Sequence, residues 1–149
     1  MGIYLNPDNE GFREAIDSEI YVDKSELLTY TNKVLGTEQK NICVSRPRRF
    51  GKSMAAKMLS AYYSKGCDSK ALFENKKIAA SASYREHLNK YNVIFLNIQN
   101  FLSGTYDIHD MIGNISLKVI TELLEEYGEF AGEKEEFLPE ILSQIYSKK

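Results

Sequence analysis

The sequence has no tryptophan, three prolines, two cysteines and no long apolar run. The two cysteines, Cys43 and Cys67, form neither a CxxC pair nor a disulfide framework, which excludes a zinc ribbon and a small disulfide-stapled scaffold. No stretch approaches the ~20 apolar residues needed to cross a bilayer, and the first residues do not resemble a signal peptide. We therefore expect a cytoplasmic protein with reduced thiols and no membrane partner.

Positive and negative side chains are present in nearly equal numbers, which gives a formal net charge of -2 over 149 residues. This balance excludes a protein that coats nucleic acid through a broad basic surface. Basic side chains are nevertheless concentrated at one place, where Arg46, Arg48, Arg49 and Lys52 fall within seven residues. The pattern predicts a local site for an anion.

Two continuous apolar runs, at Asn41–Ser45 and Val93–Ile98, are typical of strands buried in a parallel sheet. Helical spacing of apolar residues follows the first run from about residue 52 to 65, and Asp107 can cap a long helix after the second. This alternation predicts an α/β fold, with a P-loop NTPase-type parallel sheet of two to three strands flanked by helices.

We expect residues 1–149 to form the N-terminal part of one P-loop domain. Residues 1–38 would hold leading helices and a short strand. Residues 39–149 would hold the strand, the loop, the helices that follow, the second strand and the long helices.

The motif that carries chemistry is Gly51-Lys52-Ser53, the second half of the phosphate-loop pattern GxxxxGK[ST]. Arg46 stands where that pattern has its first glycine. With a strand before it and a helix after it, such a loop directs backbone N–H groups and the positive end of the helix dipole at one anion. Lys52 would be the catalytic residue on the β- and γ-phosphates, and Ser53 would ligate Mg²⁺.

The rest of the loop is expected to contribute to nucleotide binding as well. Arg48 and Arg49 would add charge-assisted contacts to a polyphosphate, and Gly51 would let an oxygen approach the backbone. Pro47 would stiffen the loop. Phe50 either packs under the sheet or touches the nucleotide.

Three segments together resemble the AAA-ATPase-like family: Tyr21-Val22-Asp23-Lys24-Ser25, the loop Ser45–Ser53, and Ala61-Tyr62-Tyr63. The resemblance runs from Ile3 to Tyr146, and the absence of the first glycine is normal in that family. It implies ATP as the nucleotide, Mg²⁺ as the metal, and a domain that typically precedes a PD-(D/E)XK nuclease-like domain in a longer protein.

A P-loop ATPase also needs an acidic residue at the end of a neighbouring strand. In the second apolar run, the stretch Val93–Leu96 is followed by the uncharged Asn97, and Asp23 is better interpreted as a helix cap. The resemblance places the acidic Walker B strand just after Lys149. We therefore expect a fragment that binds ATP, hydrolyses it little on its own, and self-associates through an uncovered sheet edge and apolar surface.

A second hypothesis remains open. The chain could be a non-enzymatic binding or interaction module, whose basic loop holds an anion, a nucleic acid or a protein partner. Binding of that kind would show equal affinity for any polyanion and would weaken steeply with salt.

Overall fold

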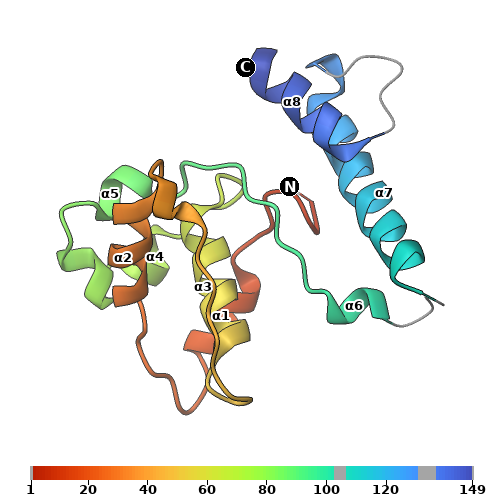
Figure 1. The fold of residues 1–149 in the computed structure, drawn as a ribbon. Coiled ribbons are helices and arrows are strands. Elements are labelled where there is room, and N and C mark those ends of the chain that lie inside the picture. Colours follow the sequence, from red (N-terminus) through yellow and green to blue (C-terminus); the bar gives the residue numbers. More distant parts are fainter. Residues whose placement is uncertain (1, 103–106, 131–136, 149) are drawn as a thin grey trace. The chain divides into compact units, whose positions relative to one another are not determined.

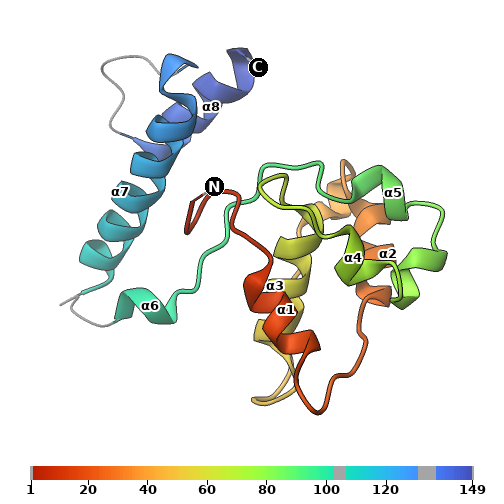
Figure 2. The same cartoon turned by 180° about the vertical axis from the view of Figure 1, so that it is seen from behind.

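The computed structural model describes residues 2–102, 107–130 and 137–148, and most of them are helical (Figures 1 and 2). The chain divides into two compact units. One contains residues 6–93, and the other contains residues 2–5 with the described residues from 94 onward.

The first unit is built from short helices arranged around one longer helix. Its helices are α1 (Glu10–Ile16), α2 (Glu26–Val34), η1 (Glu38–Lys40), α3 (Lys52–Tyr63), α4 (Lys70–Phe73), η2 (Lys77–Ala80) and α5 (Tyr84–His87). α1 packs along α3, as both views show, and α2 packs against the 3₁₀-helix η2. The helix predicted after residue 52 is confirmed as α3.

The core of this unit is centred on one face of α3. Met58, Ala61 and Tyr62 are three and four residues apart, so they lie on the same side of the helix, and all three are buried. Phe12 of α1 stacks on Phe73 of α4 with ring centroids 5.0 Å apart. The C-terminal half of α3 is thereby fixed in the core, while its N-terminal end carries the loop.

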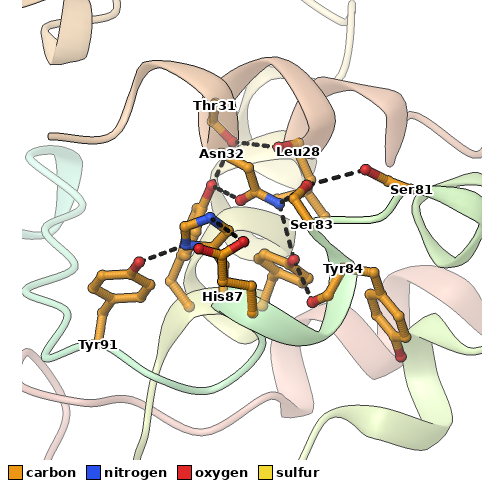
Figure 3. Close-up of polar contacts among 11 residues, drawn as sticks. Leu28, Thr31, Asn32, Ser81, Ser83, Tyr84, His87 and Tyr91 are labelled. Carbon is orange, nitrogen blue, oxygen red and sulfur yellow. Dashed lines mark hydrogen bonds and ion pairs between the residues drawn. The ribbon is translucent and has the colours of Figure 1, made fainter. Parts of the chain in front are cut away.

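A buried hydrogen-bond network surrounds Asn32 of α2 (Figure 3). Its amide Nδ2 donates to the Tyr62 hydroxyl and to Ser83 Oγ, both at 3.0 Å, and its Oδ1 accepts from the Tyr63 hydroxyl at 2.7 Å. The Tyr62 hydroxyl in turn donates to the backbone oxygen of Tyr84 at 2.8 Å. Burial raises the pKa of Tyr63 to about 12, so its hydroxyl keeps its proton at neutral pH.

The second unit is a helical hairpin with a short N-terminal segment packed into it. It contains α6 (Gln99–Leu102), α7 (Ile108–Tyr127), η3 (Gly128–Phe130) and α8 (Leu138–Lys148). The predicted cap of the long helix is confirmed, since the Asp107 side chain accepts from Asp110 N at 2.9 Å. α7 packs on α8 around a core of Leu5, Val119, Leu123, Tyr127, Ile141 and Ile145.

Glu122 of α7 fixes the N-terminal segment of this unit. Its carboxylate accepts hydrogen bonds from three consecutive backbone amides, those of Ile3, Tyr4 and Leu5, at 2.9, 2.8 and 2.7 Å. The contacts place the Leu5 side chain, which is 3% exposed, in the core between α7 and α8. Hydrogen bonds to a charged acceptor are stronger than those to a neutral one, so the Glu122 carboxylate holds the N-terminal segment more firmly than a neutral acceptor would.

We expect Glu122→Gln to lower the free energy of unfolding of this unit by about 1–3 kcal/mol. The amide has the same shape, but it loses the charge and turns an N–H donor toward backbone N–H groups. Urea unfolding followed by circular dichroism measures the change. The exposed Glu125 of the same helix supplies the control, and an equal loss in Glu125→Gln would contradict the role given to Glu122.

The expected α/β fold with a P-loop NTPase-type parallel sheet is wrong for the residues that the structure describes. Asn41–Ser45 has no regular secondary structure, every residue in it is exposed and none enters a β-bridge. The second run contributes a single antiparallel bridge, Ile94 with Leu5. An apolar run favours extended backbone, whereas a sheet also requires a partner strand in register, and these segments lack one in the described structure.

Among the described residues, no helix combines the length and the apolar character that a bilayer span requires.

Candidate functional site

The loop between residue 45 and α3 belongs to the first unit, and its residues 46–50 are exposed. The backbone has no regular secondary structure up to Pro47, turns at Arg48 and Arg49, and enters α3 at Lys52. Arg49 has φ 69°, in the left-handed region. A non-glycine residue there costs about 1–3 kcal/mol, and such strain concentrates at functional sites.

Gly51 is the residue that joins the turn to the helix. It occupies the N-cap of α3 with φ 78° and ψ 26°, a conformation that favours glycine. A Cβ at this position would lie 2.7 Å from the ammonium nitrogen of Lys24. Its backbone angles therefore favour a residue without a side chain, and a Cβ here would also displace the flexible end of the Lys24 side chain.

Lys52 folds back over the loop that precedes it. Its Nζ donates to the backbone oxygens of Arg46 and Pro47, the second at 3.1 Å. The ammonium therefore lies next to the loop backbone, and the side chain is exposed to solvent. An ammonium carries three donors, so two of them are used here by carbonyl groups.

The first turn of α3 is open to an anion. It contains no acidic residue, and in the described structure no side chain caps it. The leading N–H groups of a helix have no partner inside the helix, and the helix dipole makes this end positive. Ser53 lies in this turn and is exposed. Arg48 and Arg49 add two exposed guanidinium groups in the preceding turn.

Sequence reasoning assigned no role to Lys24, which the structure places at this loop. Its Nζ donates to the backbone oxygen of Phe50 at 2.7 Å. The only signal in the sequence was its position in the segment Tyr21–Ser25, which carries part of the family resemblance. Phe50 itself is 60% exposed, so its ring is not packed under other elements.

The acidic residue nearest to Lys24 in sequence is engaged elsewhere. The Asp23 carboxylate accepts from the backbone amides of Ser25 and Lys77, both at 2.8 Å. Partial burial raises the pKa of Asp23, but these amide hydrogen bonds outweigh burial and leave the pKa below its usual value. Asp23 is thus an ionised anchor of the segment before α2. It does not cap the helix, because the N-cap is Ser25 and the Asp23 carboxylate bonds to the amide of that residue rather than to one inside α2. The described residues contain no cluster of three or more His, Cys, Asp or Glu side chains that could hold a metal ion by themselves.

Comparison with models of known protein families gives a match. The model of the AAA-ATPase-like family, described as predicted AAA-ATPase, matches residues 10–149, a range that includes both Lys24 and the loop. No curated protein and no solved structure gives a significant match.

Proposed function

The chain belongs to the AAA-ATPase-like family of predicted AAA-ATPases, and from this membership we propose that it binds ATP with Mg²⁺ at residues 46–53. The observation that supports the site is the arrangement around Gly51. A left-handed glycine opens a helix whose first turn is uncapped, and a lysine ammonium lies against the loop that leads into it.

In this proposal the triphosphate replaces backbone oxygens as the partner of Lys52. A phosphate oxygen is anionic, so it forms a stronger hydrogen bond with an ammonium than a neutral carbonyl does. Phosphate oxygens also accept from the amides at the start of α3, where the helix dipole favours them. Gly51 leaves room for that approach, and the Ser53 hydroxyl would be a ligand of Mg²⁺.

The loop residues before the glycine have supporting roles. Arg48 and Arg49 provide positive charge on the solvent side of the polyphosphate, and Pro47 limits the conformations of the loop. Phe50 is part of the loop, and its exposed ring is available to the nucleotide.

Hydrolysis, we propose further, requires a Walker B acid, which neither Asp23 nor Asn97 supplies. The contacts and the chemistry of these two residues support this. Asp23 is held by two backbone amides, and Asn97, which follows the apolar stretch Val93–Leu96, is uncharged. Without a carboxylate to position the Mg²⁺-bound water, the loop would hold the nucleotide without efficient turnover.

Calorimetric titration with ATP, ADP and AMP in the presence of Mg²⁺ tests this function. We expect affinity to fall in that order, because each phosphate removed takes away contacts to the loop and to the metal. Heparin serves as the polyanion control, and each titration is run at about 50 mM and 200 mM salt, a range over which binding by charge alone loses orders of magnitude. Equal binding of all four ligands with a steep salt dependence would overturn ATP recognition and would favour the interaction-module hypothesis.

A further inference from the structure

We propose that Lys24 is a second phosphate-binding residue of this loop, so that two ammonium groups from different elements bind the same polyphosphate. The inference rests on the proposed function, because it adds a residue to that site. It concerns a residue outside the phosphate-loop motif, 26 positions before the residue it contacts.

The geometry places the two ammonium groups on different parts of one short loop. Lys24 bonds to the backbone oxygen of Phe50, and Lys52 bonds to those of Arg46 and Pro47. Phe50 lies between the two left-handed residues, Arg49 and Gly51. Lys24 therefore reaches the turn at the point where the chain enters α3, which is also where a phosphate would meet the helix amides.

The backbone around Lys24 is fixed, although its ammonium is at the surface. Asp23 on one side is bonded to Ser25 and to Lys77 of η2. Ser25 on the other side is fully buried, and its Oγ accepts from Ile78 N at 3.1 Å. Because both neighbours are held, the lysine stem starts from a defined point, and no ordering of the backbone is needed when the ammonium binds a ligand.

The Lys24 ammonium can exchange its carbonyl partner for a phosphate oxygen. The Phe50 oxygen occupies one of the three donors of the ammonium. A phosphate oxygen near Gly51 can take a second donor or replace the carbonyl, and its charge makes the new hydrogen bond stronger. Lys24 thus changes its environment when ATP binds, whereas a lysine that only holds the loop together would not.

Competitive acetylation of lysines, read by mass spectrometry on the full chain, distinguishes these two roles. With MgATP at ten times its Kd, the unliganded fraction falls about tenfold, so the labelling rates of Lys24 and Lys52 should fall by about the same factor. The exposed Lys33 of α2 is the control and should be labelled at the same rate with and without nucleotide.

The outcomes separate the inference from the function on which it rests. Protection of Lys52 without protection of Lys24 would overturn this inference and leave ATP binding at the loop intact. Protection of neither residue would remove the proposed function and the inference together.

Substitution of Lys24 gives a second readout. Lys24→Met keeps the apolar stem and removes the charge, and we expect the Kd for MgATP to rise about tenfold, as for the loss of one charge-assisted hydrogen bond. Lys24→Arg should restore most of the affinity, and urea unfolding should confirm that both variants are folded. A folded Lys24→Met with the wild-type Kd would overturn the proposal.

Discussion

Replacing Lys52 with alanine should weaken MgATP binding by about 10- to 150-fold, the equivalent of hydrogen bonds to charged groups worth about 1.5–3 kcal/mol. The substitution removes the ammonium that lies against the loop backbone and that we assign to the β- and γ-phosphates. Calorimetric titration with MgATP measures the effect, and a fluorescent nucleotide displaced by ATP gives an independent value.

Lys57 supplies the matched control, because it is an exposed lysine on the same helix, about one and a half turns beyond Lys52. Lys57→Ala removes the same charge and the same side chain outside the loop, so general electrostatic attraction changes equally in the two variants. Equal losses of affinity in both variants would show that ATP binding depends on net charge rather than on a specific site. Urea unfolding of both variants excludes loss of structure as the cause.

Tyr62→Ala should lower the free energy of unfolding by about 3–5 kcal/mol, the range found when a large buried aromatic side chain is removed. Tyr62 is fully buried, and its ring lies 4.9 Å from that of Tyr63, 5.3 Å from Phe73 and 6.3 Å from Tyr84, between centroids. Since domains are stable by only about 5–15 kcal/mol, the variant should unfold at much lower urea concentration or be unfolded from the start. Circular dichroism during urea titration measures this.

A second variant divides that loss between packing and hydrogen bonding, and an exposed tyrosine serves as the control. Tyr62→Phe keeps the ring but removes the hydroxyl, so Asn32 and the backbone oxygen of Tyr84 each lose a partner, at a cost of about 1–3 kcal/mol. Tyr30→Ala on exposed α2 surface should change stability by less than about 0.5 kcal/mol. If Tyr62→Phe is as damaging as Tyr62→Ala, the hydrogen-bond network rather than aromatic packing stabilises the core.

The helices were the part of the fold that the sequence predicted well. α3 and α7 have apolar residues at helical spacing over several turns, and each start was marked locally, by Gly51-Lys52 and by Asp107. These signals lie within a few residues of the structure that they specify. The sheet depended instead on which distant segments pair, and that information is not contained in an apolar run such as Asn41–Ser45.

The same distinction applies to the candidate site. The loop and its position at the start of a helix could be read from consecutive residues. The contacts of Lys24 with Phe50, and of Glu122 with the amides of residues 3–5, join positions 26 and more than 100 residues apart. Apart from the place of Lys24 in the segment Tyr21–Ser25, neither side chain differs in type or local pattern from other lysines and glutamates of the chain, so the folded chain is needed to show these contacts.

In the structure, two of the three donors of the Lys52 ammonium are used by carbonyl groups of its own chain. An anion that takes these donors competes with an internal partner, and a ligand with several adjacent negative groups does so more favourably than a ligand with one. A chloride ion provides a single centre of charge and a sulfate ion a single tetrahedral group, whereas a triphosphate provides a row of charged groups that can engage the lysine and the helix amides simultaneously. Such competition would favour polyphosphates over simple inorganic anions at this loop.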